Sequence, residues 1–359
     1  MKRSSFVAAS LVWTVTLLAA GCGDRPASTT PTVDRATATP AATTPDPTAT
    51  VRSDVTGKDA WITLPPLPGG ARQETGVVSV DGELWVLGGF DAASRIVELV
   101  EIYDPQAGEW RRGPDLPLPM HHANVAVVDG TVYVAGYLTG PSFAAQGAVF
   151  ALGSSATWER RRSMPEGTGR GASGVAVADG LLYIAGGFRG SAVDDLSAYD
   201  PATDTWTVLA KLPAPADHLV AGAIGGIVYA AGGRGGRIAA HRPRLDAYDP
   251  ASGRWSSRAP MPTSRAGAAA AVLDGRLYVF GGEGNGADIT GVFSETESYD
   301  PVEDRWTTHP QMPTPRHGTG AAAVGGAIYV PGGADFEGFG AVAVTEAFTP
   351  RIVTTDSAG

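Results

Sequence analysis

Asp81-Gly82-Glu83-Leu84-Trp85-Val86-Leu87-Gly88-Gly89 joins a two-residue turn to an apolar run that ends in two glycines. Asp-Gly favours a tight β-hairpin turn, because both central residues can take a positive φ angle. The same turn position recurs at Asp129-Gly130, Asp179-Gly180, Gly225-Gly226, Asp274-Gly275 and Gly325-Gly326. Further glycine pairs follow at Gly186-Gly187, Gly232-Gly233, Gly281-Gly282 and Gly332-Gly333. The chain therefore repeats one short hairpin, and each glycine pair indicates a close approach of two backbones.

Outward from the glycine pairs, each repeat continues to a Tyr-Asp-Pro turn and then a tryptophan. The triplets lie at Tyr103-Asp104-Pro105, Tyr199-Asp200-Pro201, Tyr248-Asp249-Pro250 and Tyr299-Asp300-Pro301. The tryptophans are Trp61, Trp110, Trp158, Trp206, Trp255 and Trp306, at intervals of 49, 48, 48, 49 and 51 residues. A fixed period of this size is typical of repeat architectures, in which one unit cannot bury its apolar face alone.

These signals resemble those of the kelch repeat family. The resemblance rests on the glycine pairs, the Tyr-Asp-Pro triplets, the tryptophans and segments such as Ala259-Pro260-Met261-Pro262-Thr263-Ser264-Arg265. It covers residues 60 to about 350 and implies a β-propeller with one four-stranded sheet per blade. We name the strands of a blade a to d, so that the Asp-Gly turn joins a to b and the Asp-Pro turn joins c to d. The prediction is an all-β fold of six blades.

Two repeats depart from the pattern. The second has Gly136-Tyr137 in place of the glycine pair and Phe150-Ala151-Leu152 in place of Tyr-Asp-Pro. The last has no tryptophan after Phe348-Thr349-Pro350, whereas Trp61 has no glycine pair before it. We therefore expect the N-terminal strand around Trp61 to become strand d of the last blade, which closes the ring without an unpaired edge. The propeller is predicted over residues 59–350, with a C-terminal tail at 351–359.

The first 58 residues are typical of a secretory signal followed by a tether. Lys2 and Arg3 precede an apolar stretch over residues 6–20, which is short beside the roughly 20 residues of a membrane span. The stretch ends in Leu-Leu-Ala-Ala-Gly-Cys22, which resembles a bacterial lipobox and contains the only cysteine. This resemblance implies a signal peptide over 1–21 and acylation of Cys22, and hence an extracytoplasmic protein anchored to a bacterial membrane. The alternative is an ordinary secreted protein with an incidental cysteine.

Thr-, Ala- and Pro-rich residues 22–58 are expected to form a disordered tether.

Composition limits the partners. The formal charge is −10, and removal of Lys2 and Arg3 with a signal peptide makes it −12. An acidic exterior argues against nucleic acid, because phosphate binding needs a basic surface. We expect a monomer with no cofactor.

The d–a and b–c loops share one face in this topology, and variable loops on a rigid scaffold usually carry binding. The b–c loops are longest in blades four to six, at 234–244, 283–295 and 334–344. The start of strand a in successive blades is occupied by Arg72, Met120, Arg170, Ala216, Arg265 and Arg316. Two positions on, expected on the same side of the strand, are Glu74, His122, Ala172, His218, Gly267 and Gly318. The arginines with His122 and His218 are predicted to form a cationic ring at the channel mouth, suited to an anionic ligand. The alternative is that the arginines bind backbone carbonyls of the next blade.

Other candidates on this face are aromatic or acidic. Phe90, Tyr137 and Phe188 follow glycine signatures and suit sugar or peptide recognition, or they pack the loops down. The carboxylates on this face could act as general acids or bases, and they are Glu74, Asp91, Asp194, Asp195, Asp217, Glu283 and Asp335. Glu74 is the best candidate among them, and the alternative is a salt bridge within the arginine ring. No shared metal site is expected for His122 and His218, because their blades are not adjacent, and His121 is expected to face the other side of its strand.

Motifs of several enzyme classes are missing from the sequence. Galactose-oxidase-like kelch enzymes use a Tyr–Cys crosslink, and the propeller region has no cysteine. The sequence also has no His-Glu-x-x-His, Gly-x-Ser-x-Gly or P-loop motif. The first hypothesis is thus a membrane-tethered binding module for an acidic glycan or an acidic protein segment. The alternatives are a sugar mutarotase or epimerase similar to sialic-acid mutarotases, and a structural scaffold for an envelope complex.

Overall fold

The structure is a computed structural model that describes residues 58–351. The predicted signal peptide, Cys22 and nearly all of the tether lie outside these residues, as does the tail beyond residue 351. Within residues 58–351, no helix has the length and apolar character needed to cross a membrane.

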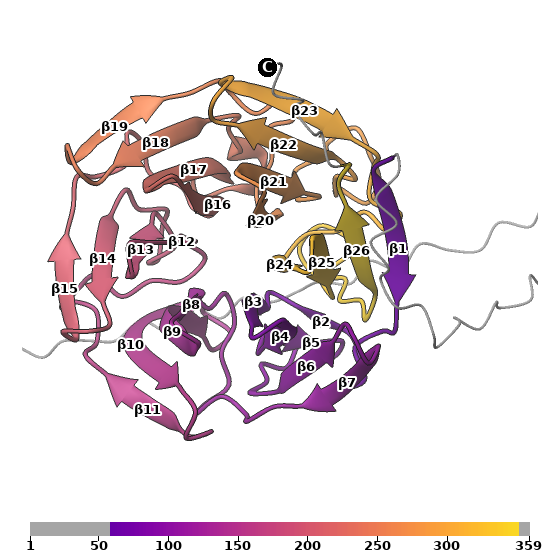
Figure 1. The fold of residues 1–359 in the computed structure, drawn as a ribbon, viewed down its shortest axis with the longest axis horizontal. Helices are drawn as coiled ribbons and strands as arrows, with labels where there is room; N and C mark the ends of the chain where they lie inside the picture. Colours follow the sequence, from indigo (N-terminus) through magenta and orange to yellow (C-terminus); the bar gives the residue numbers. More distant parts are fainter. Residues whose placement is uncertain (1–57, 352–359) are drawn as a thin grey trace, which may run out of the picture. The chain divides into compact units, whose positions relative to one another are not determined.

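Six four-stranded antiparallel sheets are arranged as the blades of a ring (Figure 1). Blade one contains β3 (Gly76–Val80), β4 (Glu83–Leu87), β6 (Val100–Asp104) and β7 (Glu109–Arg112). Blade two contains β8 (Val125–Val128), β9 (Thr131–Thr139), β10 (Ala144–Leu152) and β11 (Trp158–Arg161). Blade three contains β12 (Gly174–Ala178), β13 (Leu181–Ala185), β14 (Leu196–Asp200) and β15 (Thr205–Val208). Blade four contains β16 (Asp217–Ile224), β17 (Ile227–Arg234), β18 (Leu245–Asp249) and β19 (Arg254–Ser257). Blade five contains β20 (Ala269–Leu273), β21 (Arg276–Phe280), β22 (Thr296–Asp300) and β23 (Arg305–His309). The six-bladed prediction is confirmed.

Blade six closes the ring as predicted. Its strands are β24 (Ala322–Val324), β25 (Ala327–Pro331), β26 (Thr345–Thr349) and the N-terminal β1 (Ala60–Leu64). Trp61 lies opposite Phe348 in the β1–β26 ladder, and its indole Nε1 donates to the carbonyl of Pro310 in the preceding blade at 3.0 Å. The other five tryptophans of the period donate in the same way to the blade before their own. The repeated tryptophan is therefore a hydrogen-bonded link between neighbouring blades.

The glycine pairs lie where one blade touches the next. At Gly88 (φ +60°) a Cβ atom would lie 2.6 Å from the carbonyl oxygen of Met120, at the start of blade two. The N–H of Gly89 donates to that same carbonyl at 2.9 Å. A side chain here would separate the two blades, which explains why the position repeats as glycine.

The apolar core is divided into layers between adjacent blades. One cluster joins Val78, Val100 and Ile102 of blade one to Val132 and Val134 of blade two, and equivalent clusters fill the other interfaces. Each sheet buries both faces against its neighbours, so closure of the ring contributes one of these layers.

Short secondary-structure elements lie in the d–a and b–c loops, on the face where these loops surround the channel. β2 (Arg72–Gln73) pairs with β5 (Phe90–Asp91), and the 3₁₀ helix η1 (Ile238–Ala240) lies in the b–c loop of blade four. In blade two, β9 and β10 continue past a register irregularity between Gln146 and Val149. Blade two therefore has a longer β9–β10 hairpin at the position where the other blades have the glycine pair.

Candidate functional site

Six equivalent residues form a closed hydrogen-bonded ring around the channel. Each takes a left-handed backbone conformation; the residues are Glu74, His122, Ala172, His218, Gly267 and Gly318. The N–H of each donates to the carbonyl of its counterpart in the preceding blade, and Glu74 closes the circle on Gly318. The six peptide units thus satisfy one another and bring residues from all six blades to one narrow level of the channel.

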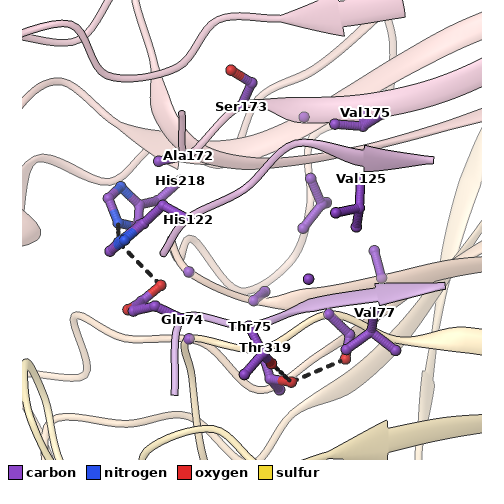
Figure 2. Close-up of a pocket in the computed structure, with 18 of the residues that line it drawn as sticks. Glu74, Thr75, Val77, His122, Val125, Ala172, Ser173, Val175, His218 and Thr319 are labelled. Carbon is purple, nitrogen blue, oxygen red and sulfur yellow. Dashed lines mark hydrogen bonds and ion pairs between the residues drawn. The ribbon is translucent and has the colours of Figure 1, made fainter. Parts of the chain in front are cut away.

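Three of the six positions carry functional side chains, and these side chains meet. The Nε2 atoms of His122 and His218 lie 2.9 Å apart, and His122 Nε2 lies 3.1 Å from Glu74 Oε2 (Figure 2). Ala172 separates the two histidines in the ring and is too small to keep their imidazoles apart. A Cβ at Gly318 would lie 2.7 Å from Glu74 Oε1, so a larger residue there would displace the carboxylate.

A second set of polar side chains surrounds this Glu/His cluster (Glu74, His122 and His218). His218 Nδ1 donates to Asp217 Oδ1 at 2.6 Å, and Arg234 forms ion pairs with both Asp217 and Glu283. His317 Nδ1 lies 3.6 Å from Glu283 Oε2 and 3.9 Å from Glu74 Oε1, and it has no hydrogen-bond partner in the described part of the chain.

Burial controls the protonation of the cluster. Burial raises the pKa of Glu74, although the nearby histidines and Arg234 act in the opposite direction. Burial holds the pKa of His122 well below its ordinary range, and the electrostatic interaction with neighbouring His218 acts in the same direction. Burial also lowers the pKa of His121 to about 4. Burial acts to raise the pKa of Asp217, but its hydrogen bond to His218 and the charge on Arg234 outweigh burial and leave that pKa lowered. His122 is therefore a neutral imidazole at neutral pH and can act as an acceptor or a ligand.

The cluster lies between two small cavities. A cavity of about 180 Å³ continues along the channel past strand a of the blades. A cavity of about 90 Å³ lies toward the loops and is bounded by Phe90, Phe143, Ile238 and Phe339. Small-molecule pockets usually have about 300–1,000 Å³, so the loop-side cavity has room for a few atoms and not for a sugar ring.

The predicted cationic ring is wrong for all four arginines. Arg72, Arg170, Arg265 and Arg316 are at most 1% exposed, and none lines either cavity. Each guanidinium turns into its own blade and binds carbonyls there; Arg170, for example, donates to Gly186 and Ile184 at 2.8 Å. The other three also pair with a buried carboxylate on strand c, and these pairs are Arg72–Glu101, Arg265–Glu297 and Arg316–Glu346. The alternative, that the arginines bind backbone carbonyls, is correct, but these carbonyls belong to the same blade and not to the next one.

The reason lies in the local backbone. The prediction placed Arg72 and Glu74 on one side of an extended strand, but the positive φ of Glu74 turns its side chain into the channel while Arg72 enters the blade. Glu74 therefore pairs with histidines, and the expected salt bridge within an arginine ring does not form. His122 and His218 meet despite their non-adjacent blades, so the reason given against a shared metal site is wrong. His121 does not turn away either, since its Nδ1 lies 2.5 Å from His122 Nδ1.

The three predicted aromatic residues have different environments. Phe90 lines the loop-side cavity and contacts His121, with ring centroids 4.2 Å apart. Tyr137 is buried in the layer between blades one and two, where it packs on Phe150. Phe188 is half-buried and pairs with Gly171, outside both cavities. Only Phe90 is therefore placed to touch a ligand in the cavities.

Sequence reasoning missed Arg234, His317 and the aromatic residues Phe143 and Phe339, and it gave Glu283 no specific role. A readable signal existed for two of them: Arg234 and Glu283 directly follow a glycine pair, as Phe90 does. Residues at this position pair across the sheet with the residue before the ring position, as in Asp217–Arg234 and Ala266–Glu283. Phe143 and Phe339 lie at loop tips, which no periodic signal locates.

Comparisons with known proteins agree with this architecture. The family described as Kelch motif matches residues 71–117, 169–213, 217–262 and 264–313. The gap over 118–168 coincides with blade two, whose sequence signature has diverged. Kelch-like protein terF of Aspergillus terreus is 31% identical over 316 residues, which cover 81% of this chain and 68% of that protein. Kelch-like protein 34 of Homo sapiens is 31% identical over 159 residues, covering 43% of this chain and 24% of that protein. The solved structure titled "Structure of YjhT" superposes with a TM-score of 0.65 at 17% identity, covering 80% of this chain and 97% of that one. At this identity the likeness supports the fold alone.

Proposed function

We propose, from the premise that this chain belongs to the kelch-repeat family of β-propellers, that it is a protein-interaction module whose partner binds the face formed by the b–c loops. The observation that carries the proposal is a group of exposed large apolar side chains on that face. Ile289, Phe336 and Phe339 are 92%, 50% and 54% exposed. Exposed apolar and aromatic groups on a rigid scaffold are the usual anchors of a protein interface.

These side chains lie on one continuous surface, the loop ridge, made of residues 234–244, 283–295 and 334–344. The Glu337 N–H donates to the Thr290 carbonyl at 2.8 Å, and His241 Nε2 lies 3.1 Å from the Gly284 carbonyl oxygen. The third loop is also fixed to blade one, since Gln73 Nε2 donates to the Gly338 carbonyl at 2.7 Å. The ridge is thus held in place before any partner arrives, which lowers the entropy cost of binding.

The first loop of the ridge, residues 234–244, carries exposed arginines that can pair with an acidic segment of the partner. Arg237 and Arg242 are exposed and form no ion pair within residues 58–351. These two replace the buried arginine ring as the basis for an anionic partner. Their replacement by Gln should slow association and reduce its dependence on salt more than it changes dissociation.

The loop-side cavity favours interaction over sugar chemistry. Glu74 and the histidines could exchange protons, but the cavity on their loop side holds only about 90 Å³ and the one on their channel side about 180 Å³, both below the usual size of a small-molecule pocket. The mutarotase alternative has no further support in the geometry, and NMR of sugar anomer exchange with wild type and Glu74→Gln tests it directly.

We also propose that the module is tethered outside the cytoplasm through Cys22. Support comes from the sequence alone, namely the charged and apolar start, the lipobox-like end and the single cysteine. Loss of fatty-acid labelling and of membrane association in Cys22→Ser is the expected result, and labelling that persists in Cys22→Ser contradicts the tether.

Chemical crosslinking on intact cells tests the interaction. Wild type is compared with the triple variant Ile289→Ser/Phe336→Ser/Phe339→Ser and with Val302→Ser. Val302 is a matched control because it is also 92% exposed but follows the Asp-Pro turn on the opposite face. We expect crosslinked partners in wild type and Val302→Ser that disappear in the triple variant. Partners that persist in the triple variant contradict the proposed face, and a partner removed by glycosidase and resistant to protease indicates a glycan instead.

A further inference from the structure

We propose that Glu74, His122 and His218 form a binding site for one divalent transition-metal ion of the zinc type. The inference goes beyond the interaction proposed for the loop ridge and does not depend on it. It begins from convergence: one ligand atom of each residue lies within 4.8 Å of the others. Two ligand atoms on a tetrahedral ion with bonds of about 2.0–2.1 Å lie about 3.3 Å apart. The separations of 2.9 Å between the imidazole nitrogens and 3.1 Å from His122 to the carboxylate are close to this value, and the third pair, His218 and Glu74, lies within 4.8 Å.

The hydrogen bonds behind the two imidazoles orient them as metal ligands. Asp217 accepts from Nδ1 of His218, which leaves His218 Nε2 with a lone pair directed at the cluster. His121 Nδ1 lies 2.5 Å from Nδ1 of His122 and fixes that ring from behind in the same way. A carboxylate or other acceptor on the far nitrogen is the usual support of a metal-bound histidine, because it sets the tautomer and the ring angle.

The charge around the cluster calls for a cation. Three carboxylates face it, those of Glu74, Asp217 and Glu283, against the single guanidinium of Arg234. This excess of acidic over basic side chains favours a cation at the cluster. Arg234 Nη2 lies 3.2 Å from His218 Nε2 and has to give up that contact when the ion binds, while its ion pairs with Asp217 and Glu283 can remain.

The donor set also indicates the class of ion. Two imidazoles and one carboxylate suit zinc and neighbouring transition metals, whereas calcium and magnesium prefer oxygen ligands alone. Three protein ligands leave a coordination position for water, and the channel cavity of about 180 Å³ has room for it. The ion would lie beneath the loop ridge, on the ring of left-handed residues that connects all six blades.

Metal analysis of the full-length protein tests the site. The purified chain is stripped with a chelator and equilibrated with Zn²⁺ by dialysis, and Co²⁺ is then used for its visible absorption. We expect one equivalent of Zn²⁺ per chain and absorption bands of four- or five-coordinate Co²⁺. His122→Asn and His218→Asn should each weaken binding by at least about 100-fold, and Asp217→Asn by about 10–100-fold. Asparagine is chosen because it tolerates the positive φ of both histidine positions.

His241→Asn is the matched control, since His241 also lies at this face but bonds to Ser264 and Gly284, outside the cluster. It should retain the full equivalent, as should the triple variant of the loop ridge, so that failure of the metal site and failure of the interaction are separable. Circular dichroism on each variant confirms folding. The proposal is overturned if stripped wild type takes up no stoichiometric Zn²⁺, or if folded His122→Asn and His218→Asn bind Zn²⁺ as tightly as wild type.

Discussion

Arg265 should stabilise the fold and should not bind the partner. Its guanidinium donates to the Thr263 carbonyl at 2.9 Å, to the Val279 carbonyl at 3.2 Å and to Glu297 Oε2 at 2.5 Å. Arg265→Ala removes all three hydrogen bonds and leaves the Glu297 carboxylate buried without its cation. Removal of one partner of a buried pair costs about 3–5 kcal/mol, most of it from the uncompensated charge. With a urea m-value of about 3 kcal/mol/M, the unfolding midpoint should fall by about 1–1.7 M.

The assay is urea unfolding followed by tryptophan fluorescence and circular dichroism, extended to a variant of the partner residue and to an apolar double variant. Glu297→Ala should be as damaging as Arg265→Ala, because it leaves the guanidinium unpaired. Arg265→Met/Glu297→Leu should be less destabilised than either single variant, because no buried charge remains. Arg265→Ala should still capture the partner at temperatures where it is folded. A variant with wild-type stability that no longer captures the partner would refute this reasoning and restore the arginines as ligand contacts.

Three further predictions concern the contacts between blades and their pH dependence. Gly88→Ala should destabilise by about 1–3 kcal/mol more than Gly82→Ala, because both residues have a positive φ but only Gly88 faces a neighbouring carbonyl; equal urea midpoints would contradict the close approach. Trp61→Phe should lower the free energy of unfolding by about 1 kcal/mol, because it loses the hydrogen bond to the Pro310 carbonyl. Trp206→Phe loses the equivalent bond to the Arg162 carbonyl and should cost the same. An unchanged stability of Trp61→Phe would show that β1 is not docked. The Ala259 N–H and the Tyr299 hydroxyl hold the pKa of Asp304 below its ordinary value. Asp304 therefore contributes stability above the unfolded pKa of about 3.9 that is lost as the pH falls through the lower folded value. In Asp304→Asn the urea midpoint should decline less steeply below pH 4 than in wild type, and parallel curves would contradict this.

The repeat signals predicted the blades because each one has a local cause. Asp81-Gly82 forms a hairpin by its own backbone preference, and Gly88 and Trp61 make the contacts that repeat at every blade boundary. Ring closure also followed from the sequence, because the last repeat lacks the tryptophan that β1 supplies. Both partners of each of these contacts recur at a fixed position in the repeat, so the period is enough to locate them.

The site depended on contacts that the period does not reveal. Three of the four arginines are buried against a carboxylate on strand c, and the sequence held a signal for these pairs. Glu101, Glu297 and Glu346 each lie two residues before the aromatic residue of strand c in a blade that begins with arginine. The meeting of His122 with His218 had no such signal. It requires the narrow ring of left-handed residues, and an extended strand does not predict that backbone conformation.

Site-specific photocrosslinking tests the central claim, that the partner binds the loop ridge, most directly. A photoreactive amino acid is placed in turn at Phe336 on the loop ridge, at Val302 on the opposite face and at Val208 on the outer strand β15, all exposed positions. The account predicts a crosslinked partner from position 336 and none from 302 or 208. Crosslinks from position 208 or 302 with none from 336 would contradict it and would favour a scaffold that makes its contacts through the blade edges or the opposite face.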